Sequence, residues 1–154
     1  MKTFAGMFTN STVVYGYTQD KIGPLQTDFS APASISFSPS SGDSVFTKPV
    51  VLLTDRYTWG AAEQLRLAFK QLKTQAPSQS VTTIGDTTAG AISSTIQRSL
   101  PNGIQYVLSG TITYDVNMNI YEKKGIPPDV AVTTPSNLST TRDVILETAV
   151  TLIP

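Results

Sequence analysis

The chain has 154 residues, enough for about one domain that buries most of its apolar surface. Its 11 basic and 11 acidic residues cancel, and no cluster of lysine or arginine exceeds Lys123-Lys124, which argues against nucleic acid or an anionic membrane as a partner. The chain contains no cysteine and no histidine, so it supplies neither a disulfide nor an imidazole for catalysis or metal binding.

The first part of the chain predicts a helix end followed by two strands. Residues 1–8 are typical of the last turn of a helix, and 12–18 and 34–39 predict strands on either side of a Gly- and Pro-containing loop at 19–32. No apolar run approaches the ~20 residues that span a bilayer, and the first residues are too interrupted for a signal peptide. Because the chain opens inside an element, we expect it to be a fragment.

The middle of the chain predicts one βαβ unit. A continuous apolar run at 48–54 is typical of a strand covered on both faces, as in a parallel sheet. The helix expected over 60–73 has an apolar face, and Arg66 is expected on the opposite, polar face with two lysines. The stretch 81–91 predicts a short strand that runs into a glycine-containing loop.

Alternating residues after position 91 predict hairpins. The segments 94–100, 104–116 and 119–125 are separated by two turn sequences, Pro101-Asn102-Gly103 and Asn117-Met118-Asn119. They predict one hairpin at each turn.

The tail predicts a short strand at 129–134 and a helix over 139–153. Ser139 or Thr140 is expected to cap this helix, with Asp143 in its first turn. The predicted fold class is therefore α/β, with a parallel sheet, hairpins and a C-terminal helix.

Four strings lie in the order and at the spacing found in one family: "KPVVLLTDRYTWGAAE", "TTIGDTTAG", "LPNGIQY" and "YEKKGIPPDV". Together they resemble the C-terminal half of the tail-specific, or C-terminal processing, serine peptidases, and more closely their tricorn-like branch. The resemblance covers residues 1–132 and implies a ClpP/crotonase-like spiral of ββα units. Residues 1–154 are then expected to form the C-terminal portion of one peptidase catalytic domain, without its upstream half.

The resemblance assigns roles to three residues. Where this chain has Gly60, the family usually has the serine that attacks the scissile carbonyl, and the N–H of the next residue, here Ala61, helps to hold the oxyanion. One branch activates the serine with a later lysine, but this chain has no lysine between Lys73 and Lys123. The tricorn-like branch uses a histidine from the N-terminal half and a glutamate shortly before a G-[IV]-x-P-D string, which Glu122 matches in "EKKGIPPD".

The glycine at the nucleophile position has two interpretations. Either the protein descends from a peptidase that lost its serine, or glycine was introduced to silence the enzyme. A takeover by Thr58 requires a shift of two residues along the bend, which disfavours it. The resemblance implies no cofactor and no metal, a peptide or protein substrate in extended form and an extracytoplasmic location, and it leaves an oligomer open.

Each of these residues also has a purely structural interpretation. Gly60 can be a glycine at a helix start, Glu63 a cap of its own helix, and Glu122 a surface glutamate beside two lysines. Trp59 either lines a specificity pocket or fills the core. Two function classes stay open: a serine-type peptidase or its disabled copy, and a non-catalytic peptide-binding or scaffold domain that kept the fold. An acyl-CoA enzyme of the crotonase type is disfavoured, because no phosphate-binding loop is recognisable.

Overall fold

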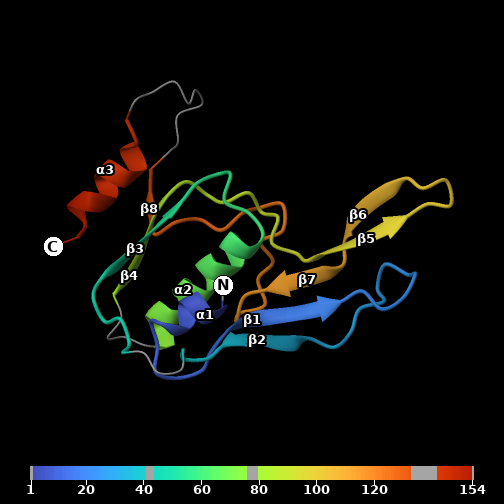
Figure 1. Ribbon diagram of the computed structural model, residues 1–154, viewed down its shortest axis with the longest axis horizontal. Helices are drawn as coiled ribbons and strands as arrows, with labels where there is room; N and C mark the ends of the chain where they lie inside the picture. The colour runs from blue at the N-terminus through green and yellow to red at the C-terminus, as the bar shows by residue number, and fades with distance from the viewer. Residues whose placement is uncertain (1, 41–43, 76–79, 133–141, 154) are drawn as a thin grey trace.

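The helices and strands of the protein are assigned from a computed structural model that describes residues 2–40, 44–75, 80–132 and 142–153 (Figure 1). In chain order they are α1 (Lys2–Gly6), β1 (Val13–Asp20), β2 (Ala33–Phe37), β3 (Val50–Thr54), α2 (Ala61–Gln75), β4 (Val81–Gly85), β5 (Thr95–Ser99), β6 (Gln105–Ser109), β7 (Thr111–Tyr114), β8 (Val130–Ala131) and α3 (Val144–Thr151).

The parallel sheet predicted from the apolar run at 48–54 is confirmed. Strands β3, β4 and β8 lie side by side in this order, and β3 pairs with β4 in parallel from Val50–Val81 to Thr54–Gly85. Helix α2 connects β3 to β4, which makes the predicted βαβ unit. Parallel strands end at the same edge of a sheet, so the bend before α2 and the loop after β4 begin next to each other.

The remaining strands form an antiparallel sheet and a separate hairpin. The antiparallel sheet has the order β2-β1-β7, and β5 pairs only with β6. The hairpin of β5 and β6 extends away from the body of the molecule (Figure 1). At its tip the Gly103 N–H donates to the Leu100 carbonyl at 2.9 Å, so the hairpin predicted at this turn is confirmed.

The chain reverses at Asn117-Met118-Asn119 as predicted, but the hairpin there is short. One antiparallel bridge joins Tyr114 to Ile120, and the Asp115 N–H donates to the Asn119 carbonyl at 3.0 Å. The physical reason is the buried Asp115 carboxylate, which accepts the N–H groups of Asn117 and Asn119, each at 2.9 Å. These bonds fold the segment into a compact aspartate turn, and residues 121–129 do not continue as a strand along β7.

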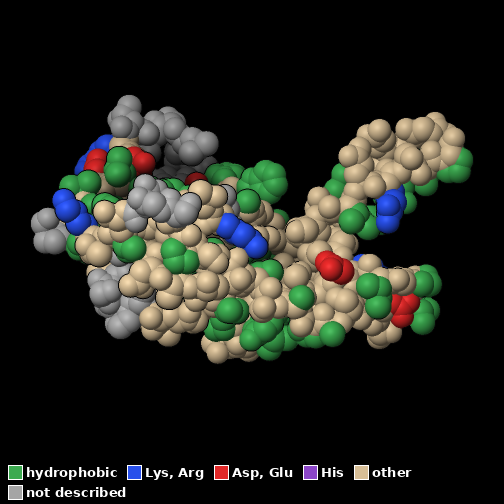
Figure 2. Space-filling model, turned by 60° about the horizontal axis from the view of Figure 1, so that its bottom comes forward, with side chains coloured by type: hydrophobic (Ala, Val, Ile, Leu, Met, Phe, Trp, Pro, Cys, Tyr) green, Lys and Arg blue, Asp and Glu red, His purple; other side chains and the backbone are tan. Residues whose placement is uncertain are grey.

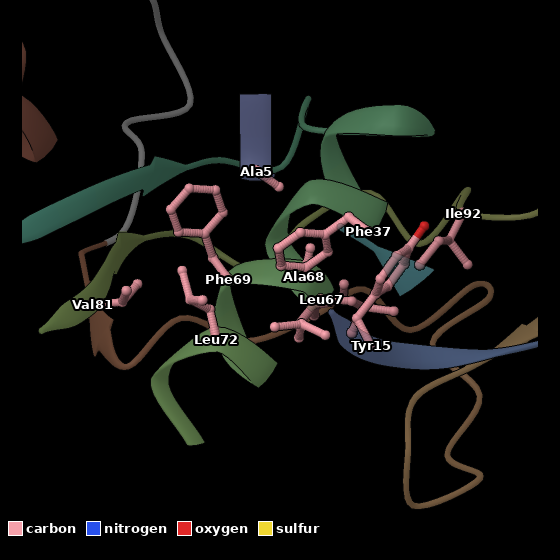
Figure 3. Close-up of a cluster of buried hydrophobic side chains, with 11 residues drawn as sticks. Ala5, Tyr15, Phe37, Leu67, Ala68, Phe69, Leu72, Val81 and Ile92 are labelled. Atoms are coloured by element: carbon pink, nitrogen blue, oxygen red, sulfur yellow. The ribbon is translucent and has the colours of Figure 1, made fainter. Parts of the chain in front are cut away.

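Helix α2 lies between the two sheets and provides much of the hydrophobic core (Figures 1 and 3). Its apolar face packs against side chains of β1, β2 and the segments that follow β4 and β7. The buried cluster consists of Ala5, Val13, Tyr15, Phe37, Leu67, Ala68, Phe69, Leu72, Val81, Ile92 and Ile126. This packing fixes the start of α2 relative to the loop after β4.

Arg66 shares the polar face of α2 with Lys73, as predicted, because both lie beside the Asp129 carboxylate, but this part of the face is buried. Its side chain is 3% exposed, its Nη2 donates to the Pro127 carbonyl at 3.2 Å, and it lies 3.8 Å from the Asp129 carboxylate. The segment from 126 to 129 covers this side of α2, which the helical pattern alone could not indicate. Burial lowers the pKa of Arg66, and the charge of Asp129 opposes this effect.

Asp129 makes the stability dependent on acid pH. Burial raises its pKa, but hydrogen bonds with Thr83 and the charges of Arg66 and Lys73 outweigh burial and lower it below the ordinary value. Such a carboxylate contributes stability above its unfolded-state pKa of about 4, and this contribution is lost as the pH falls through the lower folded-state pKa.

We therefore expect the free energy of unfolding, measured with urea, to fall as the pH drops below about 4. Asp129→Asn should be less stable at pH 7 and should lose less stability on acidification, because the titrating group is gone. Parallel pH profiles for the two proteins would show that Asp129 does not contribute.

Helix α3 packs against β3 and β4 and begins later than expected. The cap is Asp143, whose carboxylate accepts the Leu146 N–H at 2.9 Å, so the placement of Asp143 in the first turn is wrong. The expected caps Ser139 and Thr140 lie outside the described residues. None of the helices in the described part of the chain has the length and hydrophobicity needed to cross a membrane. The predicted α/β class, with its parallel sheet, hairpin and C-terminal helix, is confirmed.

Candidate active site

The bend between β3 and α2, residues 55–60, is held by its own side chains. The Asp55 carboxylate accepts the Tyr57 N–H and the Thr58 hydroxyl, each at 3.0 Å, and the Thr58 oxygen accepts the Asp55 N–H at 3.0 Å. This aspartate turn leads the chain from the strand into the helix. Because the Thr58 hydroxyl is engaged within the bend, its takeover as a nucleophile is disfavoured further.

Gly60 is the last residue before α2 and has a φ of +60°. This left-handed conformation favours glycine, because a Cβ usually collides with the backbone there. At this position, however, an ideal Cβ would have no other atom within 4 Å, apart from its immediate chain neighbours. A side chain at position 60 would therefore project into open space, as a nucleophile at a strand–turn–helix bend must.

We expect Gly60→Ala to lower the free energy of unfolding by about 1–2 kcal/mol, the cost of a left-handed conformation for an L-residue. Urea denaturation measures this change. Gly103→Ala is the matched control, because Gly103 also has a positive φ, +85°, and no neighbour within 4 Å of an ideal Cβ. A much larger loss at position 60 than at position 103 would contradict the open space beside Gly60.

Ala61 begins α2, and its N–H has no acceptor among the described residues. The first N–H groups of a helix have no partner within the helix, so they are available to a ligand. The residue is exposed. Ala61 therefore has the geometry expected of an oxyanion donor.

The interpretation of Glu63 as a cap of its own helix is wrong. Its side chain is fully buried, and its carboxylate accepts the Thr88 hydroxyl and the N–H groups of Gly90 and Ala91, the last two at 2.8 Å. A capping box would use the Gly60 N–H, but this group donates to the Ala91 carbonyl at 3.0 Å. Glu63 thus holds the loop after β4 rather than the start of α2.

The loop after β4 also pairs directly with the bend. In addition to the bond from Gly60, the Ala89 N–H donates to the Thr58 carbonyl at 2.9 Å. These backbone bonds and the Glu63 carboxylate fix the position of the loop beside Gly60. Two of the four sequence strings, "WGAAE" and "GDTTAG", therefore form one structural unit.

The segment that follows β7 joins the same unit. The Ile126 N–H donates to the Thr88 hydroxyl oxygen at 2.8 Å, and the Lys123 N–H donates to the Gly90 carbonyl at 2.7 Å. Gly90 cannot carry a side chain here, because a Cβ would lie 2.6 Å from the Gly125 nitrogen. The string "YEKKGIPPD" is thereby anchored beside the loop, which places Glu122 at the site.

Glu122 is half-buried, and its carboxylate is held on one oxygen only. Its Oε2 accepts the N–H and the hydroxyl of Ser93, at 3.1 and 2.7 Å, whereas Oε1 has no donor among the described residues. In this part of the chain it forms no ion pair with Lys123 or Lys124, so its interpretation as a surface glutamate beside two lysines loses its main support. One carboxylate oxygen remains available to a further donor.

Gly60, Ala61 and Glu122 line one pocket of about 550 Å³. Among the described residues that line it, Glu122 is the one charged side chain. Trp59 lies at the pocket and is 68% exposed, so it does not fill the core. The described residues that line the pocket are Trp59, Gly60, Ala61, Gln64, Ala91, Ile92, Ser93, Ser94, Thr95, Val107, Leu108, Ser109 and Glu122.

The pocket lacks two chemical groups of a serine peptidase triad. Position 60 has no hydroxyl, and the sequence contains no histidine to serve as base. Within the described ranges, no three His, Cys, Asp or Glu side chains come together as metal ligands. The groups that are present can form hydrogen bonds with a ligand: the Ala61 N–H can donate to a carbonyl of a bound peptide, and the Glu122 Oε1 can accept from a donor.

Ser93 is a site residue that the sequence interpretation does not identify. It lies 29 positions before the carboxylate that it holds, and the serine pair at 93–94 resembles ordinary loop composition. The sequence gives only a weak indication of this role, namely that Ser93 follows shortly after the string "TTIGDTTAG".

Comparison with known proteins identifies relatives of this chain. The sequence model of peptidase family S41 matches residues 2–132. A candidate peptidase from Parabacteroides merdae, of known crystal structure, is 32% identical, with a TM-score of 0.82 over 98% of this chain and 46% of that protein. This chain therefore spans about half of the length of that relative. No curated protein matches the chain.

Two further solved structures share the fold at lower identity. A lipoprotein from Streptococcus agalactiae is 18% identical, with a TM-score of 0.62 over 97% of this chain and 46% of that chain. The photosystem II D1 C-terminal processing protease is 19% identical, with a TM-score of 0.51 over 87% of this chain and 31% of that chain. At these identities the likeness extends to the fold alone.

Proposed function

Because the chain belongs to peptidase family S41, we propose that the pocket beside Gly60 is a serine-type peptidase site of the tricorn-like branch that has lost its nucleophile. In this form it binds an extended peptide and does not cleave it. The observation that carries the proposal is the convergence of Gly60, Ala61 and Glu122 on one pocket, although Glu122 lies some sixty positions after the bend.

Each of the three residues then has a role in the ancestral reaction. A serine hydroxyl at position 60 would attack the scissile carbonyl, and the Ala61 N–H would donate to the oxyanion that develops. The free Oε1 of Glu122 would accept an N–H of the histidine that acts as base, which holds the ring in the correct orientation. This role requires a histidine from outside residues 1–154, in the upstream portion of the same catalytic domain.

A non-catalytic peptide-binding or scaffold function is the second candidate, and one observation favours it. Gly60 removes the attacking hydroxyl but leaves the bend, the Ala61 N–H and the buried Glu63 contacts in place. A site that keeps this architecture without its nucleophile retains the means to bind a peptide backbone. The two candidates differ in what a serine at position 60 would do: it would restore cleavage in a disabled peptidase site, and it would not in a domain that serves for binding alone.

The first test of the proposal is the activity of the chain itself. We expect residues 1–154 to show no hydrolysis of casein or of an unstructured peptide, because neither the nucleophile nor the base is present. Chromatography of the released products measures this hydrolysis. Turnover that a serine-directed phosphonate abolishes would contradict the proposal, since it would require a nucleophile other than residue 60.

We also propose an extracytoplasmic location for the parent protein. The proposal is supported by the similar fold of a lipoprotein from Streptococcus agalactiae. Cell fractionation tests this location, with the protein detected by an antibody against this chain. Recovery of the protein with cytoplasmic markers would contradict the proposal.

A further inference from the structure

The β5–β6 hairpin has an apolar face that the described part of the chain leaves uncovered. Side chains alternate between the two faces of a strand, so β5 and β6 each present one set to this side. Figure 2 shows the hairpin as an arm that stands away from the body, with hydrophobic side chains along it. The apolar face consists of Ile96, Leu100, Ile104, Tyr106 and Leu108, which are between 36% and 57% exposed.

The outer edge of β5 has no strand partner among the described residues. Bonds from Leu100 N–H to the Ile104 carbonyl and from Gly110 N–H to the Ser94 carbonyl, both 2.8 Å, mark the positions at which its backbone faces β6. By the alternation of an antiparallel ladder, the N–H and carbonyl groups of the odd-numbered residues of 95–99 point away from β6. A two-stranded hairpin is marginally stable in water, and such an edge is a template for a third strand.

Arg98 lies in the middle of the apolar face, opposite Tyr106. Its side chain is exposed and forms no ion pair or hydrogen bond within the described residues. Apolar side chains continue on both sides of it, toward the pocket and toward the hairpin tip. An unpaired cation in this setting is complementary to an anionic group on a partner that covers the apolar face.

The hairpin is continuous with the pocket at Gly60. Thr95 at the start of β5 and Leu108 and Ser109 at the end of β6 line that pocket. The loop that carries Ala91, which is bonded to Gly60, runs directly into β5. A peptide that occupies the pocket in extended form can therefore continue along the β5 edge.

We propose that the β5 edge binds, as an added strand, an extended peptide in which an apolar, an acidic and an apolar residue occupy alternate positions. These side chains lie beside Ile96, Arg98 and Leu100 on one face of the enlarged sheet. The acidic group is an Asp or Glu side chain and not a chain terminus, because the apolar surface continues beyond Arg98. The inference rests on the proposed function, since it assumes that the Gly60 pocket receives a peptide.

The role of the Arg98 charge is tested by measuring how tightly three short peptides bind to the chain of 154 residues. The probes are Ser-Val-Thr-Glu-Thr-Val-Ser and its analogues with Gln or Lys in place of Glu, each labelled with fluorescein for anisotropy. We expect the Glu peptide to bind about twofold to fivefold more tightly than the Gln peptide, the range for an exposed ion pair. Arg98→Glu should reverse the order, with the Lys peptide bound most tightly. An unchanged order in Arg98→Glu would overturn the proposal.

The edge is tested with proline, which removes one outward N–H without removing a backbone hydrogen bond between β5 and β6. Gln97→Pro should weaken binding of the Glu peptide at least about tenfold, because several strand bonds depend on that edge. Gln105→Pro is the matched control: it lies on the outer edge of β6 and loses the same side-chain bond between Gln97 and Gln105. Binding that survives Gln97→Pro but not Gln105→Pro would overturn the choice of edge.

Trp59, the one tryptophan of the chain, separates the two proposals. If none of the peptides binds and none changes the fluorescence of Trp59, the proposed function fails together with this inference. If all three peptides bind equally, and both Arg98→Glu and Gln97→Pro leave binding unchanged, the pocket binds peptides and the inference about the hairpin alone is overturned. A chain that sediments as a dimer, and as a monomer after Gln97→Pro, would show that a second copy occupies the edge instead.

Discussion

Restoring serine at position 60 should produce peptidase activity at least about 10³-fold above that of the glycine form, because loss of the nucleophile removes most of the acceleration of a triad. The experiment needs a longer chain, in which residues 1–154 follow the upstream half of an S41 catalytic domain with its histidine. A serine at position 60 has open space, since an ideal Cβ meets no atom within 4 Å, and its cost is the strain of about 1–2 kcal/mol for an L-residue at a φ of +60°. Release of peptides from casein, and labelling by a serine-directed phosphonate, measure the gain.

The assignment of Glu122 is tested in the same serine-containing protein. Glu122→Gln should lower kcat by about 10²–10⁴-fold, because the amide no longer orients the base as a carboxylate does. Glu147→Gln is the matched control, since Glu147 is exposed and pairs only with Arg142 among the described residues. If Glu122→Gln keeps full activity, the family role does not apply to Glu122, and the pocket would have to use another acid.

The strand, bend and helix at 50–75 could be predicted because their signals are local. A strand buried on both faces is a continuous apolar run, and a helix repeats its apolar residues with the helical period. The hairpin at Pro101-Asn102-Gly103 is likewise encoded in its turn residues, which adopt a turn regardless of their surroundings. The order of the family strings then predicted that Gly60 and Glu122 belong to one site.

The contacts that build the site could not be predicted, because each joins residues far apart in the sequence. Glu63 follows the pattern of a helix cap, yet its partners lie 25 to 28 positions later. Arg66 follows the pattern of a polar helix face, yet a segment some sixty positions away covers it. Asp115 folds the second predicted hairpin into a compact turn. In each case a tertiary contact outweighs a local preference.

Replacing Glu63 by alanine should lower the free energy of unfolding by about 3–5 kcal/mol, because each of three donors loses its buried acceptor at a cost of roughly 1–3 kcal/mol, and partial relaxation recovers some of the loss. These donors are the Thr88 hydroxyl and the N–H groups of Gly90 and Ala91. The loop after β4 should then separate from the bend, because the backbone bonds between loop and bend provide no acceptor for these three donors. Urea denaturation measures the stability, and Trp59 fluorescence reports on the pocket.

The size of the effect tests whether Glu63 stabilises the protein through the loop after β4, as its hydrogen bonds indicate. Glu63→Gln keeps the volume and one acceptor oxygen but turns an NH₂ group toward one of the donors, so it should cost about 1–3 kcal/mol, less than alanine. The exposed Glu147→Gln should leave stability nearly unchanged. If Glu63 only capped its own helix, alanine would cost no more than about 1–2 kcal/mol and the pocket would keep its Trp59 signal. A graded loss that is largest for alanine, together with a changed Trp59 signal, would instead show that this buried carboxylate maintains the bend at Gly60 in its folded form.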